Sequence, residues 1–160
     1  MMPRAPIEPE GMFDGLSASA ILLGAFVDIA TTMIAVSLFV LWLAPDVVSQ
    51  DQAVARKALE ESQATPIYMI GNVVLGALGT VLGAFVGARR AGRLHVRHGG
   101  WIAVTSTAIG FVLTLLSAPP EVDTASPLWA EALAWLLILP AGISGGALAA
   151  ALPVAQNRER

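Results

Sequence analysis

The chain has 160 residues, of which 56% are hydrophobic and only 13% are charged, with a net charge of −3 and no cysteine. Soluble domains carry about 25% charged residues, so this composition indicates a protein whose main solvent is lipid. Nothing in the charge balance suggests a nucleic-acid partner. The lack of cysteine excludes disulfides, thiolate nucleophiles and Cys-ligated metals.

The amino-terminal residues 1–15 are rich in Pro and Gly with mixed charge, and we expect them to form a disordered tail. The apolar run that follows, 16–43, is longer than the apolar region of a signal peptide and lacks a clear cleavage site. We therefore expect it to remain in the protein as a membrane span, with a cleaved signal peptide as the alternative.

Four apolar segments predict four transmembrane helices. About 20 apolar residues cross a bilayer core, and only a helix satisfies its backbone there without a closed barrel. The fourth segment contains Pro140, which is expected to kink it. The predicted spans are 16–43, 66–88, 101–118 and 128–152. The predicted fold is therefore an all-α integral membrane four-helix bundle, a single domain over 16–152, followed by a short tail at 153–160.

The distribution of Lys and Arg predicts the orientation of the chain. Two basic residues, Arg56 and Lys57, lie in the linker 45–65, on one side of the membrane. Seven lie on the other side: Arg4, Arg89, Arg90, Arg93, Arg97, Arg158 and Arg160. The positive-inside rule then places both termini in the cytoplasm, as in a multi-pass protein of a bacterial inner membrane.

The basic linker 89–100 suggests a contact with the bilayer surface. Its four arginines are candidates for holding anionic lipid, at about 1 kcal/mol for each basic residue. They are Arg89, Arg90, Arg93 and Arg97. His95 and His98 share the linker, but a metal site needs three or four ligands, so we expect both to be solvated and expect no metal.

The linker 45–65 is the only sizeable soluble segment. Ser49 is expected to cap a short helix over 50–62. The i,i+4 pairs Arg56/Glu60 and Lys57/Glu61 would support that helix by a few tenths of a kcal/mol each. A solvated linker without a helix is the alternative.

Small residues form two stripes that predict helix packing. Small side chains let backbones approach each other in lipid, where no hydrophobic effect drives helices together. One stripe lies on the second span and the other on the fourth, and both could pack within the monomer or form a homodimer. They consist of Gly76, Gly79, Gly83 and Gly87, and of Gly142, Gly145, Gly146 and Ala149. A glycine face lining a substrate path is the functional alternative for the first stripe.

Asp28, inside the first apolar run, is the residue most suggestive of function. An acid in lipid is costly and is a functional hypothesis by default. Counting about 1.5 Å per residue from each span's first residue places it in a layer with Thr32, Asn72 and Thr114. No Lys, Arg or His reaches that depth, so desolvation favours the protonated acid. Asp28 is therefore either a hydrogen-bonded structural acid or a proton-exchanging group.

The chain resembles small bacterial four-span membrane proteins in three features. These are the second span ending in GARRAGR, the acidic linker APPEVDTASP and the glycine-rich fourth span. The layout with one acid in the first span also resembles small multidrug-resistance exporters, which use a glutamate there. This chain has Asp28 within GAFVDIATT, lacks the aromatic-rich motif around the acid and has longer linkers.

The favoured function is non-enzymatic: a scaffold or accessory subunit that associates with a membrane-protein partner or a second copy through its glycine faces. The alternative is a proton- or cation-coupled small transporter or channel that uses Asp28. No cofactor is expected. Serine-type catalysis lacks a base near the hydroxyl cluster Thr105–Thr107, and a membrane enzyme ranks third.

Overall fold

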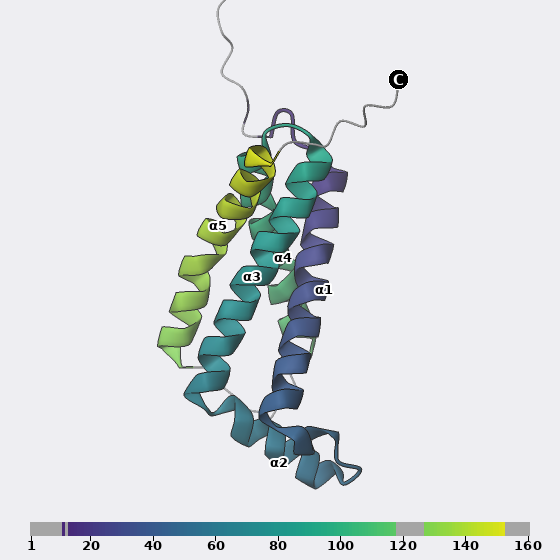
Figure 1. Ribbon diagram of the computed structural model, residues 1–160, viewed down its shortest axis with the longest axis vertical. Helices are drawn as coiled ribbons and strands as arrows, with labels where there is room; N and C mark the ends of the chain where they lie inside the picture. Colours follow the sequence, from purple (N-terminus) through teal and green to yellow (C-terminus); the bar gives the residue numbers. More distant parts are fainter. Residues whose placement is uncertain (1–10, 12, 118–126, 153–160) are drawn as a thin grey trace, which may run out of the picture.

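The computed structural model describes residues 11, 13–117 and 127–152. Four long helices lie side by side as a bundle, and a short helix lies across one end (Figure 1). The elements are α1 (Ala18–Leu43), the 3₁₀ turn η1 (Pro45–Val48), α2 (Gln52–Gln63), α3 (Pro66–Ala91), α4 (His95–Ser117) and α5 (Leu128–Ala151). No strand occurs in this part of the chain, and the predicted all-α four-helix fold is confirmed.

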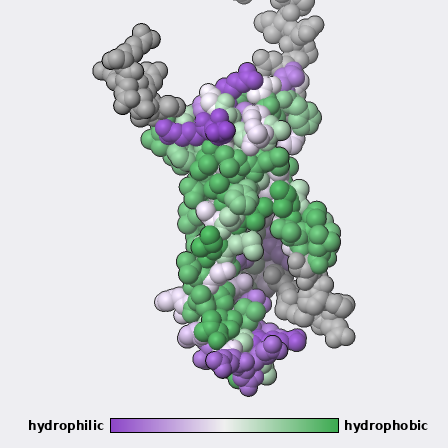
Figure 2. Space-filling view, turned by 90° about the vertical axis from the view of Figure 1, so that its right-hand side faces the viewer, coloured by the Kyte–Doolittle hydropathy of each residue, from purple (hydrophilic) through white to green (hydrophobic). Residues whose placement is uncertain are grey.

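The bundle has large apolar side chains on its outside and small residues on its inside, as expected of a membrane protein. All four long helices are long and apolar enough to cross a bilayer. The buried core consists largely of alanine, whereas leucines, phenylalanines and tryptophans are exposed around it. Apolar side chains cover the middle of the molecule and hydrophilic ones gather at both ends (Figure 2). The chain is therefore a small multi-pass membrane protein.

The four long helices are not packed symmetrically. α3 contacts α1, α4 and α5, and α4 likewise contacts the other three, but the backbones of α1 and α5 do not come close to each other. α3 and α4 thus form the inner pair, with α1 and α5 on opposite sides of it. One end of the bundle holds the start of α1 and the α3–α4 turn, and we call it the arginine end. The opposite end carries α2 (Figure 1).

The α3–α4 connection is much shorter than the predicted linker 89–100. α3 continues to Ala91 and α4 begins at His95, so only three residues lie between them. Gly92, with φ +70°, ends α3 in the left-handed conformation that glycine adopts without strain. Gly99 lies inside α4 because the backbone of Gly142 approaches it too closely for a side chain. The loop prediction was wrong because it took the polar first turns of α4 as linker.

The segment between α1 and α3 contains the short helix α2. Asp51, rather than the predicted Ser49, caps it: Asp51 Oδ1 accepts hydrogen bonds from the backbone N–H of Ala53 at 2.8 Å and of Val54 at 3.4 Å. Ser49 Oγ accepts a hydrogen bond from the Asp51 N–H at 3.3 Å, just before the helix begins. The pairs Arg56–Glu60 and Lys57–Glu61 form ion pairs of 2.7 and 3.7 Å on the exposed face.

Most of both predicted tails lies outside the described residues. Of the tail at 1–15, residue 11 and residues 13–15 are described, and the Phe13 ring lies tilted against that of Trp101 in α4, with ring centroids 5.0 Å apart. The carboxyl-terminal tail 153–160 and the acidic linker 118–126 are not among them. α5 runs through Pro140 as one helix.

Candidate functional site

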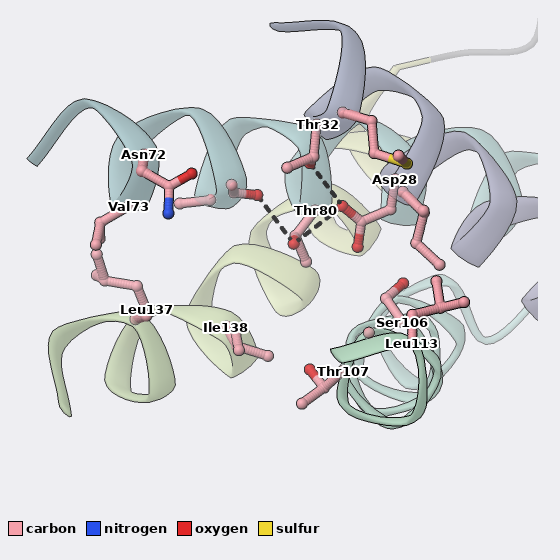
Figure 3. A pocket seen from close by; sticks show the side chains of 16 residues that line it. Asp28, Thr32, Asn72, Val73, Thr80, Ser106, Thr107, Leu113, Leu137 and Ile138 are labelled. Atoms are coloured by element: carbon pink, nitrogen blue, oxygen red, sulfur yellow. Dashed lines mark hydrogen bonds between the residues drawn. The ribbon is translucent and has the colours of Figure 1, made fainter. Parts of the chain in front are cut away.

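Asp28 is held at the α1–α3 interface. The residue is 4% exposed. Thr32, one turn away on α1, donates a hydrogen bond to Asp28 Oδ1 at 3.4 Å, and Thr80 of α3 lies 3.3 Å from the same oxygen (Figure 3). The close approach depends on Gly83, where an added Cβ would meet Asp28 Cβ at 2.6 Å. A small residue on α3 thus makes room for the acid on α1.

Thr80 provides a hydrogen bond for either protonation state of Asp28. Thr80 Oγ1 lies 3.3 Å from Asp28 Oδ1 and 3.1 Å from the Gly76 carbonyl oxygen, and it has one hydrogen to donate. When Asp28 is ionised, the hydroxyl donates to the carboxylate. When Asp28 is protonated, the acid donates to Thr80, which donates to Gly76. Neither state leaves Thr80 Oγ1 or Asp28 Oδ1 unpaired, and an unpaired buried polar group would cost about 1–3 kcal/mol.

Asp28 also lies on the wall of a cavity of about 370 Å³. Residues from all four long helices line it, and half of them carry apolar side chains. No basic residue and no second acid is among the lining residues. The polar ones are Asp28, Thr32, Asn72, Thr80, Ser106 and Thr107. Figure 3 shows the hydroxyls of Ser106 and Thr107 on the α4 side of the cavity and Asp28 with Thr80 on the other.

Ser106 is the side chain whose position most needs explanation. It is 8% exposed, and its Oγ makes no hydrogen bond of good geometry among the described residues, although it lies near enough to the Asp28 carboxyl group to interact with it. An unpartnered buried hydroxyl is destabilising unless a water, an ion or a solute completes it. The Ser106 hydroxyl lies beside the Asp28 carboxyl group, which it approaches from α4 (Figure 3). Asp28, Thr80 and Ser106 therefore bring polar groups from three helices to one part of the cavity wall, which suits a water or a cation.

The structure brings together only part of the predicted polar layer. Asp28 and Thr32 are in contact, and Asn72 lines the same cavity further toward the α2 end. Thr114 is exposed, donates to the Gly110 carbonyl oxygen of its own helix at 3.0 Å and does not line the cavity. Thr80 and Ser106 stand nearest to Asp28 instead, and sequence reasoning missed both.

The positions of the helix ends explain this difference. From the arginine end, about 1.5 Å per residue places Asp28 about 15 Å deep and both Thr80 and Ser106 about 16.5 Å deep. The same count places Asn72 and Thr114 about 28.5 Å deep. Depths counted from Trp101 ignored the six residues of α4 that precede it. A count from His95, and along α3 from Ala91, would have found Thr80 and Ser106.

Both glycine stripes are in contact with other helices of the same chain. Added Cβ atoms at Gly79, Gly83 and Gly87 would meet α1, and Gly87 would also meet Ile102 of α4. Those at Gly142 and Gly146 would meet α4, and one at Gly145 would meet α3. Gly76, by contrast, has nothing within 4 Å of an added Cβ and lines the cavity.

His98, at the arginine end, was predicted to be solvated, and the structure shows otherwise. His98 is fully buried, not solvated: its Nε2 accepts a hydrogen bond from the Ser17 N–H at 2.9 Å, and its Nδ1 lies 3.1 Å from the Leu94 carbonyl oxygen. The ring therefore joins the first turn of α4 to the start of α1. The prediction failed because it took His98 as part of a loop. Arg97 reaches back to the Gly11 carbonyl oxygen at 3.1 Å, and Arg90 and Arg93 are exposed.

Comparison with known proteins gives no relative from which to transfer a role. No protein-family model, no curated protein and no solved structure matches this chain.

Proposed function

We propose that this protein is a small membrane carrier or channel that exchanges a proton for a small monovalent cation at Asp28. In this exchange the Asp28 carboxyl O–H gives up its proton to water in the cavity, and the cation then lies against the carboxylate. The observation that carries the proposal is a buried acid on the wall of a cavity, with no basic residue among the lining residues.

The neighbouring hydroxyls favour reversible exchange over a permanently neutral acid. Thr80 can pair with Asp28 in both protonation states because it has a carbonyl oxygen as its second acceptor. Ser106 adds a hydroxyl oxygen from α4 beside the same carboxyl group. A single negative charge among hydroxyl oxygens matches a cation of charge one, because an ion left with excess charge in lipid is costly.

The scaffold hypothesis is less well supported by the packing. It depended on glycine faces being available to a partner, and both faces meet helices of the same chain. A scaffold would also not need a cavity around a deeply buried acid. We therefore place the carrier first and the scaffold or accessory subunit second, reversing the order that the sequence favoured.

Orientation and location remain as the charge distribution suggests. We propose a bacterial inner membrane, with the arginine end and both termini in the cytoplasm, on the positive-inside rule. The α2 end would then face outward. Asp28 would lie slightly nearer the cytoplasmic surface than the outer one.

The test is proton movement in vesicles that contain the purified full chain and a trapped pH dye. We expect gradients of Na⁺, K⁺ or methylammonium to drive proton movement through the unmodified protein. Asp28→Asn should abolish that movement, since an amide keeps the shape of the acid and cannot exchange a proton. Asp46→Asn is the matched control, because Asp46 is exposed in η1. Proton movement through this variant should equal that through the unmodified protein.

Two outcomes would count against the carrier. One is an unmodified protein that moves no protons under any of the three gradients. The other is Asp28→Asn retaining full proton movement while folding normally.

A further inference from the structure

A second, apolar hollow lies between α3 and α5 and shares no residue with the Asp28 cavity. Its volume is about 280 Å³, and its six lining residues are Leu78, Val81, Leu82, Phe85, Leu148 and Leu152. The four leucines are between 44% and 59% exposed. No polar side chain lines this groove, so within a bilayer it is suited to a hydrocarbon chain.

The groove leads to a basic residue. One turn beyond Phe85, the guanidinium carbon of Arg89 lies over the Phe85 ring, 5.5 Å from its centroid. Arg90 follows directly and is exposed. The α5 wall ends nearby at Leu152, because α5 runs toward the arginine end and its Gly146 lies against the His95 backbone. The groove therefore opens where the headgroups of a bilayer would lie.

Charge at this end favours an anionic occupant. Among the described residues it carries four arginines and one acid, Asp14. An arginine fork matches the oxygens of a phosphate group and binds it with two parallel hydrogen bonds. Each basic residue near a membrane surface adds about 1 kcal/mol of attraction for anionic lipid, which is about fivefold in affinity.

We propose that the groove and Arg89 together bind one anionic phospholipid. An acyl chain lies between α3 and α5 against Phe85 and Leu148, and the phosphate lies beside Arg89 and Arg90. This site is independent of the proposed exchange at Asp28, since the two share no residue. The bound lipid would anchor the arginine end of the bundle in one leaflet. The occupancy of the site would depend on the charge of the lipids in that leaflet.

The test uses the full chain in vesicles of phosphatidylglycerol and phosphatidylcholine with identical acyl chains. Native mass spectrometry then identifies the lipid that each protein retains. We expect the unmodified protein to retain phosphatidylglycerol in preference to phosphatidylcholine. Arg89→Gln should lower that preference about fivefold. Arg93→Gln is the matched control, because Arg93 lies beside Gly15 on the α1 side and not at the groove, and it should lower the preference much less.

Two variants test the acyl chain separately from the headgroup. Leu82→Trp and Leu148→Trp each place a ring in the groove from a lipid-exposed position on a different helix, and each should reduce retention of both lipids. Excess soluble glycerol phosphate should not displace the lipid. Equal effects of Arg89→Gln and Arg93→Gln, unchanged retention in both Trp variants, displacement by glycerol phosphate, or a lipid-free dimer would each overturn the proposal.

Discussion

Thr80 Oγ1 has a single hydrogen and two acceptors within reach, Asp28 Oδ1 and the Gly76 carbonyl oxygen. A hydroxyl in this position can serve a carboxylate or a carboxylic acid without rearranging the helices. Its second partner is the backbone of its own helix, which is always present. At the scale of single residues, this is what separates Asp28 from a simple structural acid.

Thr80→Val removes the hydroxyl and keeps the branched shape. We expect the free energy of unfolding in detergent to fall by about 0.6 kcal/mol, the usual value for such a bond between membrane helices. Proton movement in vesicles should also fall. The comparison is Thr107→Val, which lines the same cavity but loses only a bond to Ala103 of its own helix, and should leave proton movement near normal. Equal proton movement through both variants would show that Thr80 takes no part in the exchange.

His98 gives a second prediction at the residue scale. Replacing it by Leu leaves the half-buried Ser17 N–H without its acceptor, which should lower the free energy of unfolding by about 0.5–1.5 kcal/mol. His98→Gln offers an amide oxygen in its place and should recover part of the loss. Thermal unfolding in detergent measures both. A Gln variant as unstable as the Leu variant would show that ring packing, not the hydrogen bond, matters here.

At the scale of helices, close approach of α1 to α3 is what positions Asp28. The two helices meet through glycines, and the backbone oxygen of Gly24 lies 2.5 Å from where a Cβ of Gly83 would be. A methyl group there cannot be accommodated by rotating a side chain, since its neighbour is backbone. The helices would have to separate, and Asp28 would then lose contact with Thr80.

Gly83→Ala and Gly76→Ala form a matched pair on one helix. We expect Gly83→Ala to lower the free energy of unfolding by about 1–3 kcal/mol because it overpacks the interface. Gly76→Ala meets nothing within 4 Å and should be neutral, or stabilising by up to about 1 kcal/mol through helix propensity. Denaturation in detergent followed by circular dichroism compares them. Equal stabilities would contradict the packing described for Gly83.

The helices themselves were largely predictable from sequence, but the first turns of α4 were not. The span 66–88 was predicted from its apolar run and begins at Pro66 as expected, capped by Thr65. The start of α4 was missed by six residues because His95–Gly100 is polar or glycine-rich, and lipid hydropathy cannot detect a helix outside the apolar core. That error moved Thr114 into the predicted layer and left Ser106 out.

At the scale of the whole molecule, four apolar helices around an alanine- and glycine-rich interior account for the bundle. Apolar length fixes the number of spans, and small residues allow them to pack. The cavity was not predictable in the same way. It depends on how four helices are placed relative to one another, and on α1 and α5 remaining apart across the inner pair. A sequence pattern on one helix carries no information about that distance.

The central claim is that water reaches Asp28 through this cavity, and single cysteines test it directly because the chain has none of its own. Thr107→Cys places a thiol on the cavity wall, and Val112→Cys places one on the exposed, lipid-facing side of the same helix. Thiols react as thiolates, which form in water and not in lipid. With Ser49→Cys as the exposed positive control, a charged methanethiosulfonate reagent should label Thr107→Cys and spare Val112→Cys. Labelling of Ser49→Cys alone would contradict the account.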